Sequence, residues 1–496
     1  MASQAPATAE RHHQNTAALP KALRHKANFI NGEWVAHGDG GFTEVLHKYH
    51  GTVLAKLPNA SSAQMDQAIA AALESGKTLA ALSAGMRHAA LEKLAAGIEA
   101  HAVDLARLIM QEGGKPIGYA KNEVERALVT VRTAAAEALR FTGEAVALDF
   151  GKGEGRHAFT TRVPVGVIAA VTPFNFPLNL VLHKVAPAMA AGCPVVLKPA
   201  SKTPLSALLL AHLIEEAGWP KGAFNVLVCG REVAEELITD ERVAMFSFTG
   251  SDAVGWRLKS ICGKKKVALE LGGNAAVVID EGADLAKAAM EVAMGANLYA
   301  GQTCISTQRI FVVEPLFGRF RELLVNEFSE LKAGDPADPD VSVGPIIDAK
   351  HFKRVQDWLA EAVEGGAEVL AGGRTVDAER HVFAATLLTR TNRHMKVYKD
   401  EVFGPITLVE PVADFTAALD RVNDGRYGLQ AGVYTNNIAH MKQAHRHLAV
   451  GAVIMNGTPG FRIDSMPYGG IKDSGLGREG VRYAMEEMTE PRLLVY

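Results

Sequence analysis

After residue 163 the chain alternates short runs rich in β-branched residues with longer amphipathic segments, and this alternation limits its fold more than any other feature. Strand-length apolar runs separated by helix-length segments are typical of βαβ units, in which helices cover both faces of a parallel sheet. Ligands of such sheets bind at the carboxyl ends of the strands. The pattern predicts strands over 165–171, 194–197, 224–228, 243–248 and 266–271, and helices over 178–191, 205–217, 232–238 and 252–262.

A second α/β series begins after Gly273 and continues to about residue 472, with a predicted strand over 275–279 and a predicted helix over 285–298. Before the first series, residues 66–147 show the helical recurrence of Ala and Leu every three or four positions. A chain of 496 residues is long enough for two or three domains. We therefore expect two doubly wound α/β domains with an active site in the cleft between them.

The composition excludes several classes of partner. The formal net charge is −3 and no basic block occurs, so nucleic acid is not an expected partner. No run of about 18 apolar residues occurs, so we expect no transmembrane helix and no membrane partner. The four cysteines form no C-x-x-C pair, which argues against a metal site and favours a reducing, cytoplasmic setting.

The two ends of the chain differ in character. Residues 1–27 are polar and Ala-rich and lack the apolar core of a secretory signal, so we predict a disordered extension. Their arginines and histidines leave a mitochondrial transit peptide as the alternative. The last stretch, 490–496, ends in an apolar Leu-Leu-Val run. Because an exposed apolar strand is a sticky edge, we expect this stretch to pair with another chain.

Cys304 is the candidate nucleophile. It lies in the stretch Gly-Gln-Thr-Cys-Ile-Ser at 301–306, a predicted loop before the strand 309–313, where small residues leave room for a substrate. A single cysteine is more often a small buried apolar residue, and we interpret Cys193, Cys229 and Cys262 in that way.

Glu270 is the candidate base. It ends an otherwise apolar predicted strand, where partial burial would raise its pKa toward the range of a general base. The alternative is a salt bridge to one of the lysines at 264–266.

Asn175 and a glycine-containing turn are further candidates. Two prolines in Pro-Phe-Asn-Phe-Pro fix the Asn175 amide at a strand's carboxyl end, where it could stabilise an oxyanion, although capping of the next helix is the alternative. The turn Gly-Ser-Asp-Ala-Val-Gly at 250–255 opens a predicted helix and would let a phosphate approach backbone N–H groups. Its spacing departs from the usual dinucleotide fingerprint, so this signal is weak alone.

Seven motifs taken together resemble the aldehyde dehydrogenase superfamily, in that family's order and approximate spacing, from about Asn28 to the end of the chain. They are PFNFP at 173–177, VLKP at 196–199, FTGS at 248–251, LELGGN at 269–274, GQTC at 301–304, EVFGP at 401–405 and PYGG at 467–470.

The resemblance implies a fold and a reaction. The fold is α/β, with a cofactor domain, a catalytic domain and a small β oligomerisation arm. The Cys304 thiolate attacks an aldehyde, and the Asn175 amide and the Cys304 backbone N–H hold the oxyanion. NAD or NADP accepts a hydride, and Glu270 activates the water that hydrolyses the thioester. The implied domains are 28–141 with 163–272 for the cofactor, 273–472 for catalysis, and 142–162 with 473–496 for the arm of a homodimer or homotetramer.

The same resemblance assigns the cofactor contacts. Lys198 and Glu401 would hold ribose hydroxyls, and Phe403 would pack beside the nicotinamide. The full cofactor-binding set that it implies is Thr172, Pro173, Phe174, Lys198, Ser201, Phe248, Gly250, Ser251, Val254, Leu271, Glu401 and Phe403. One position departs from the pattern of NAD-specific members, which often carry Glu where this chain has Ser201. A small hydroxyl beside Lys202 can accommodate a 2′-phosphate, so NAD and NADP both stay open.

The expected substrate funnel contains cations where relatives that take simple aldehydes have apolar groups. The residues that we expect to line it are Arg126, Phe176, Asn179, His183, Thr303, Ile305 and Arg462. Arginine is a natural receptor for carboxylate, phosphonate, phosphate or sulfonate, so we expect a small anionic or polar aldehyde. Alternatively both arginines form structural ion pairs with Glu123, Glu125 or Asp464, and the enzyme takes neutral aldehydes. A cofactor-independent cysteine hydrolase and a non-catalytic family member are the remaining alternatives.

Overall fold

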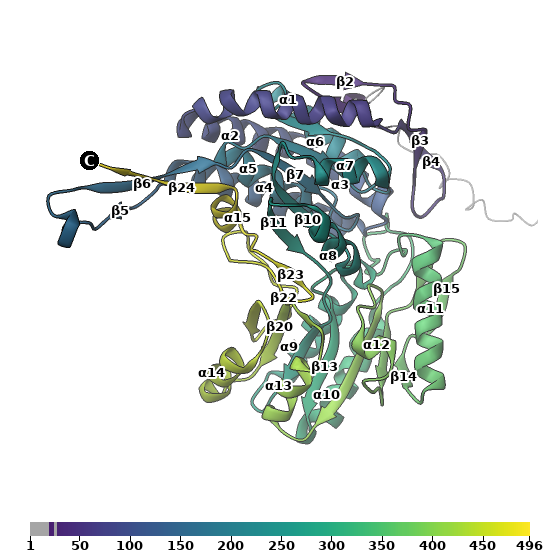
Figure 1. The fold of residues 1–496 in the computed structure, drawn as a ribbon. Helices are drawn as coiled ribbons and strands as arrows, with labels where there is room; N and C mark the ends of the chain where they lie inside the picture. Colours follow the sequence, from purple (N-terminus) through teal and green to yellow (C-terminus); the bar gives the residue numbers. More distant parts are fainter. Residues whose placement is uncertain (1–18, 24–26) are drawn as a thin grey trace, which may run out of the picture.

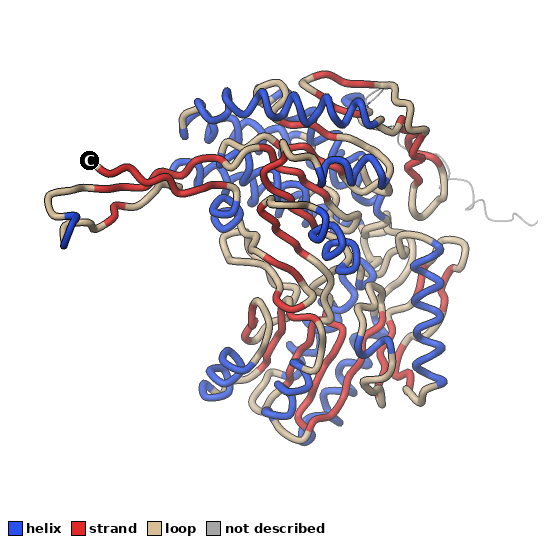
Figure 2. The backbone as a smooth tube through the Cα atoms, in the orientation of Figure 1, coloured by secondary structure: helices blue, strands red, loops and turns tan. Residues whose placement is uncertain are grey.

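The computed structural model describes residues 19–23 and 27–496, which form two α/β bodies and a β-arm that projects from the first body (Figures 1 and 2). Most of the predicted extension, residues 1–27, lies outside the described residues. Its described end is packed, since Leu23 in η1 (Lys21–Leu23) is buried against α6 (Leu205–Glu216). For residues 19–23 the prediction of disorder is therefore wrong, because an apolar side chain there joins the core.

The first body is built on an eight-stranded sheet with the order β2-β1-β9-β8-β7-β10-β11-β23. The strands from β9 to β11 are parallel, and the outer ones pair antiparallel. The central strands are continuous apolar runs because both faces of the sheet are covered. The strands are β1 (Asn28–Ile30), β2 (Glu33–Val35), β7 (Val167–Val171), β8 (Val195–Lys198), β9 (Phe224–Val226), β10 (Val243–Thr249), β11 (Lys266–Glu270) and β23 (Gly475–Leu476).

Helices cover both faces of this sheet, some in contact with its strands and others packed on those helices. Those of the first face share one apolar core and those of the second face share another. On the first face lie α2 (Ala84–Ala100), α3 (Ala102–Gly113), α4 (Ile117–Arg140), α5 (Asn179–Ala191) and α6, and on the second lie α1 (Ser62–Ala81), α7 (Arg231–Thr239) and α8 (Asp252–Ile261). Helix α5 is buried along its whole length, since α2, α4 and β7 contact it, and it carries the polar side chains of Asn179, His183 and Lys184 into the interior.

The second body is a seven-stranded sheet with the order β14-β17-β18-β13-β12-β20-β21, parallel except at β14. Its strands are β12 (Ala275–Ile279), β13 (Thr307–Val313), β14 (Glu368–Ala371), β17 (Thr386–Thr389), β18 (Ile406–Val412), β20 (Gln430–Tyr434) and β21 (Ala452–Met455). Its helices are α9 (Leu285–Asn297), α10 (Glu314–Glu330), α11 (Ala349–Glu364), α12 (Lys396–Lys399), α13 (Phe415–Asn423) and α14 (Ile438–His447).

Short elements complete the molecule. They are the pairs β3 (Phe42–Leu46) with β4 (Val53–Pro58), β15 (Thr375–Asp377) with β16 (Val382–Phe383), and β19 (Tyr427–Gly428) with β22 (Ile471–Lys472), and the 3-10 helices η2 (Gly151–Gly153) and η3 (Leu298–Gly301). Within residues 19–23 and 27–496, no helix is long and apolar enough to cross a membrane. In the same residues, no group of three or more His, Cys, Asp or Glu side chains is placed to hold a metal ion.

The projecting arm corrects two predictions. It consists of β5 (Ala145–Val146), β6 (Ala158–Pro164) and β24 (Thr489–Val495), in the order β24-β6-β5 (Figure 1). The apolar tail pairs along its length with β6 of its own chain, so the expectation that it needs another chain for pairing is wrong for that edge. Its outer edge has no neighbouring strand in this sheet.

The predicted arm segment 473–496 is also too long. Residues before β24 return to the first body, where β23 pairs with β11 and α15 (Val481–Glu487) packs on α5. The reason is apolar burial, since Val481, Met485 and Met488 join the core that α5 shares.

Candidate active site

A cavity of about 250 Å³ lies where the carboxyl ends of β7, β10 and β11 meet the loop before β13. This is the sheet edge at which a parallel α/β fold binds ligands. Predicted residues that line it are Arg126, Pro173, Phe174, Asn175, Phe176, Asn179, His183, Gly250, Ser251, Glu270, Leu271, Cys304, Ile305, Glu401, Phe403 and Arg462. Residues that line it without having been predicted are Leu180, Thr249, Gly272, His351, Arg354 and Tyr468.

The other predicted residues do not line this cavity. They are Thr172, Lys198, Ser201, Phe248, Val254 and Thr303. Thr172 and Thr303 are buried behind it. Phe248 lies beneath the turn at Gly250, where an added Cβ would come within 2.6 Å of its ring. It therefore supports the turn from below and forms no part of the cavity wall.

The loop that carries Cys304 is held by unusual backbone and buried hydrogen bonds. Tyr299 and Ala300 adopt left-handed backbone, with φ of 52° and 53°, and the Tyr299 hydroxyl donates to the Gly113 carbonyl. Gln302 donates to the Tyr299 and Pro345 carbonyls and accepts from Ile347 N. Left-handed non-glycine residues cost about 1–3 kcal/mol each and persist where the surroundings enforce them. The sulfur is thus presented by a rigid, strained turn.

The Asn175 amide is tied to this loop. Its Nδ2 donates to the Gln302 carbonyl at 3.0 Å, and its Oδ1 is buried without a partner in the described chain. An amide nitrogen carries two N–H groups, so one N–H of Asn175 is free. That geometry suits an oxyanion donor and excludes the helix-capping alternative, because no side chain caps α5.

Cys304 is a thiol in this environment. Burial raises its pKa to about 12, the Tyr468 hydroxyl lowers that pKa, and the charges of Glu401 and Glu270 raise it. The sulfur lies 3.4 Å from Tyr468 Oη. A thiolate must therefore be generated by a base during the reaction. The other cysteines are buried.

Glu270 is a buried carboxylate with no hydrogen-bond partner for either oxygen within the described residues. Burial raises its pKa well above the usual range, and the negative charge of Glu479 raises it further. The alternative of a lysine salt bridge is not realised, since Lys266 pairs with Glu490 at 2.7 Å. A carboxyl group whose pKa is raised in this way suits the exchange of a proton with a reacting group.

Behind Glu270 lies a buried set of charges centred on Glu479. Its Oε1 accepts from Lys184 at 2.9 Å and its Oε2 from Arg462 at 3.0 Å. Burial opposes ionisation, but Lys184, His183 and Arg462 hold the pKa of Glu479 well below its usual range. The Nε2 atom of His183 lies 2.8 Å from Asp464 Oδ1. His183, which was predicted to bind the substrate, is therefore paired with a carboxylate of the chain itself.

The two predicted anion anchors differ. Arg462 is buried and paired with Glu479, so the structural alternative holds for that side chain, with a partner that was not predicted. The Arg126 guanidinium has no ion pair or hydrogen bond among the described residues, and Glu123 is taken by Lys115. Burial and the charge of Arg462 lower the pKa of Arg126. Arg126 is therefore a cation that lines the cavity without a partner in the part of the chain that the structure describes.

The turn at the start of α8 is the part of the chain whose fit to the pyrophosphate of a dinucleotide can be assessed. Gly250 and Gly255 have no room for side chains, since an added Cβ would lie 2.6 Å from Phe248 and 2.4 Å from Leu271. The helix has no side-chain cap at Ser251, which leaves its first N–H groups for a phosphate. The Thr249 hydroxyl is buried without a partner in the described part of the chain. These residues fit a pyrophosphate.

The segment with Glu401 and Phe403, which the resemblance assigns to the nicotinamide side, is also held in place. Glu401 Oε1 accepts from Gly273 N at 2.8 Å, and burial raises the pKa of Glu401 to about 7. Phe403 has a left-handed backbone, with φ of 47°, and its ring meets Phe174 edge-on at 5.8 Å. A bulky residue in that conformation is a sign of a functional constraint.

Lys202 does not occupy the place expected of it beside a 2′-phosphate. Lys202 forms an ion pair with Asp348, at the start of α11, and is not a free cation beside Ser201. The ammonium group of Lys198, at the end of β8, makes no hydrogen bond or ion pair among the described residues, and burial lowers its pKa. The cation available to a cofactor at this edge is therefore Lys198.

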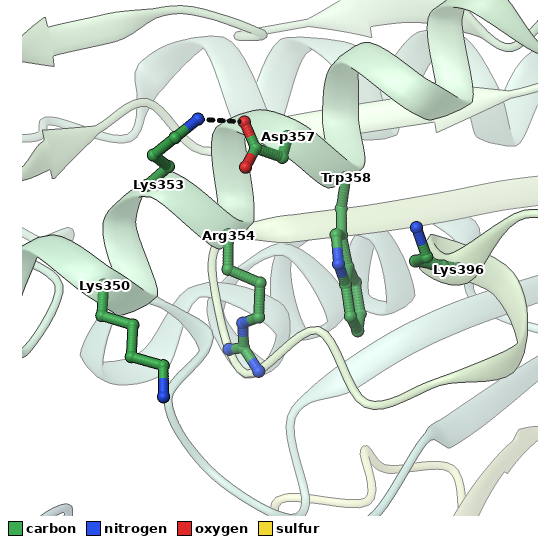
Figure 3. A pocket seen from close by; sticks show the side chains of 6 residues that line it. All are labelled: Lys350, Lys353, Arg354, Asp357, Trp358 and Lys396. Atoms are coloured by element: carbon green, nitrogen blue, oxygen red, sulfur yellow. Dashed lines mark hydrogen bonds and ion pairs between the residues drawn. The ribbon is translucent and has the colours of Figure 1, made fainter.

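A second hollow of about 400 Å³ lies along α11 (Figure 3). Lys350, Arg354 and Trp358 point into the same space, while Lys353 pairs with Asp357 at 2.7 Å. Arg354 lines both hollows and donates to the Val402 carbonyl at 2.7 Å. It thereby braces the segment that carries Glu401 and Phe403.

Tyr468, Glu479 and Lys184 are charged or hydroxyl-bearing residues of this site among those that sequence reasoning missed. A signal existed for Lys184, which interrupts an apolar segment, and for Glu479, which lies in a glycine-rich stretch. Buried charges are costly unless paired, so both pointed to a buried partner of opposite sign. The identity of that partner was not visible in the sequence.

Comparison with known proteins supplies the family. The aldehyde dehydrogenase family model matches residues 34–494. The chain is 43% identical over 469 residues to the 3-sulfolactaldehyde dehydrogenase of Priestia megaterium, covering 94% of this chain and 97% of that protein. It is 37% identical over 464 residues to the NADP(+) succinate-semialdehyde dehydrogenase GabD of Escherichia coli, covering 93% and 95% of the two chains.

Solved structures agree. Aldehyde dehydrogenase 21 from Physcomitrella patens, in complex with the reaction product succinate, superposes with a TM-score of 0.91 at 39% identity and covers 95% of this chain and 98% of its own. A glyceraldehyde-3-phosphate dehydrogenase of Methanocaldococcus jannaschii, complexed with NADP, gives a TM-score of 0.88 at 37% identity, with coverage of 92% and 98%. The predicted α/β fold and NAD(P)-dependent enzyme class are confirmed, and the chain belongs to the aldehyde dehydrogenase family.

Proposed function

We propose that this chain oxidises a small anionic or polar aldehyde to its carboxylic acid with NAD or NADP, through a thioester on Cys304. The observation that carries the substrate class is Arg126, a cation without a partner in the described chain that lines the same cavity as Cys304 and Glu270. An unpaired charge is costly to desolvate, so a substrate anion is the partner that this site lacks. The names of the sulfolactaldehyde and succinate-semialdehyde dehydrogenases support the same class.

The chemistry follows from the placed residues. Glu270 takes the thiol proton of Cys304, and the sulfur bonds to the aldehyde carbon while the C=O π pair becomes an oxyanion. The free Asn175 amide N–H and the Cys304 backbone N–H stabilise that oxyanion. The bound nicotinamide supplies the acceptor for the hydride that leaves this carbon. After Glu270 has released the thiol proton to solvent, it removes a proton from water, whose oxygen bonds to the thioester carbonyl carbon as the C–S bond breaks and Cys304 leaves as a thiolate.

Both cofactors fit the proposed contacts. Glu401 and Lys198 would hold ribose hydroxyls, and the first N–H groups of α8 would hold the pyrophosphate. Positions 198 and 201 carry a lysine and a serine. Neither side chain is a carboxylate, so neither would repel the 2′-phosphate of NADP. The NADP complex of the Methanocaldococcus enzyme supports this proposal.

The arm supports a homodimer or homotetramer. Leu493, Leu494 and Val495 of β24 are 52%, 53% and 39% exposed, on a strand whose outer edge has no neighbour in its sheet. An apolar edge strand is a template for pairing, and a second copy of the chain would cover it.

A spectrophotometric panel tests the proposed function. Purified protein is assayed by NAD(P)H absorbance with NAD⁺ and NADP⁺, each against lactaldehyde, succinate semialdehyde, 3-sulfolactaldehyde, phosphonoacetaldehyde, glyceraldehyde 3-phosphate and propanal. We expect the highest kcat/KM with one of the anionic or hydroxylated aldehydes. Equal values across the panel, or a preference for propanal, would overturn the proposed substrate class.

A further inference from the structure

The hydroxyl of Tyr468 lies against the sulfur of Cys304. The Oη–Sγ distance is 3.4 Å, and this is the only hydrogen bond that the hydroxyl makes among the described residues. The ring is 3% exposed and packs with Ile305 and Leu429. A buried phenol O–H requires a partner, and here the partner is the atom that reacts.

Three constraints fix this hydroxyl. Tyr468 and Glu479 exchange backbone hydrogen bonds of 2.9 and 2.6 Å. The Arg462 guanidinium lies 3.6 Å from the centroid of the Tyr468 ring, and Glu479 holds that guanidinium in turn. A cation over the ring face favours a polarised O–H, so the hydroxyl is both positioned and a stronger donor.

We propose that Tyr468 is a catalytic residue that donates its O–H to the Cys304 thiolate, when the thiolate forms and again when it leaves the thioester. A thiol can donate or accept, but a thiolate only accepts, so ionisation fixes the direction of this hydrogen bond. The S–H proton goes to Glu270, and Tyr468 keeps its own proton throughout. The inference rests on the proposed function, because it affects turnover only where Cys304 is the nucleophile.

The physical case is the cost of a buried thiolate. Burial raises the pKa of Cys304 and the Tyr468 hydrogen bond lowers it, while Glu270 and Glu401 add unfavourable negative charge. Burial and the charge of Cys304 raise the pKa of Tyr468 well above its usual range, which keeps the phenol protonated as a donor. Tyr468 is therefore the neutral group that offsets part of this cost without adding charge.

Alkylation of Cys304 by iodoacetamide tests this role without aldehyde or cofactor. The rate is followed by mass spectrometry of the Cys304 peptide from neutral to alkaline pH, because the thiolate is the reactive form. For Tyr468→Phe we expect the pH curve to move up by about one unit, which slows alkylation in the neutral range about tenfold. Tyr434→Phe is the matched control, since its hydroxyl contacts Glu291 in the second body and no residue of the cavity. An unchanged curve for Tyr468→Phe would overturn the proposal.

A graded replacement guards against a folding defect. If Tyr468→Phe does not fold, 3-fluorotyrosine at position 468 retains the ring and lowers the phenol's own pKa. A stronger donor stabilises the thiolate more, so the alkylation curve must move to lower pH, and an unmoved curve contradicts the role. The proposed function fails separately, if Cys304→Ser retains dehydrogenase turnover.

Discussion

Arg126→Met is the sharpest test of the substrate class. The guanidinium of Arg126 lines the cavity with no partner in the described chain, so its removal breaks no internal ion pair. A hydrogen bond to a charged group contributes about 1.5–3 kcal/mol. At 1.4 kcal/mol per tenfold, that range corresponds to a loss of about 10- to 150-fold in kcat/KM for the preferred anionic aldehyde. The value for propanal should not change.

For Arg126→Met we expect no loss of thermal stability, in contrast to the loss of activity. Arg126 and Arg462 repel one another, since the charge of Arg462 lowers the pKa of Arg126. Removal of the unpaired cation should therefore leave the melting temperature unchanged or raise it. Arg462→Ala is a poorer probe, because it removes one of the two cations that donate to the buried Glu479 carboxylate and would therefore lower the free energy of unfolding as well.

Steady-state kinetics and differential scanning fluorimetry measure both effects on the same samples. Arg132→Met is the control on the same helix, since Arg132 is exposed and pairs with Glu99 at 2.8 Å. It should change neither kcat/KM nor the melting temperature by a measurable amount. Equal losses for the anionic aldehyde and propanal in Arg126→Met, or a lowered melting temperature, would refute the argument that Arg126 is a substrate anchor.

Three further outcomes are expected. Glu270→Gln removes both the acceptor of the thiol proton and the hydrolytic base, so in rapid-quench assays the burst of NAD(P)H should be slowed and turnover should then stall at the thioester, whereas a wild-type steady rate would contradict both roles of Glu270. Lys184→Met removes a cation that lowers the pKa of Glu270, and a carboxylate acts as a base only above its pKa. The rising limb of the deacylation rate should therefore move to higher pH, and an unmoved limb would exclude this coupling. Leu494→Lys charges the exposed edge of β24 and should lower the sedimenting mass, whereas an unchanged mass would place the subunit contact elsewhere.

Much of the fold could be predicted because its causes are local. The strand expected over 266–271 is observed as Lys266–Glu270, and the helix expected over 178–191 is observed as Asn179–Ala191. Such elements follow from a period of apolar residues and from punctuation by glycine, as at Gly192, which ends α5 in a left-handed conformation. Edge pairing was not predictable, because the two-residue strand β23 has no pattern of its own and is defined by its partner β11.

The candidate site could also be predicted only in part. Cys304, Glu270 and Asn175 could be nominated from the sequence because Glu270 places a charge at the end of an apolar strand, and because Cys304 and Asn175 lie in loops next to predicted strands. By itself the sequence determined the parallel α/β architecture, the edge of the sheet that binds ligands and the residue types that meet there.

Only the tertiary structure decided which charged side chains pair with one another. Lys184 and Glu479 are 295 positions apart, and Cys304 and Tyr468 are 164 apart. The structure pairs Arg462 with Glu479, leaves Arg126 without a partner among the described residues, and turns Lys202 toward Asp348. Ion pairing depends on distance and burial, and neither quantity is encoded in the spacing of residues along the chain.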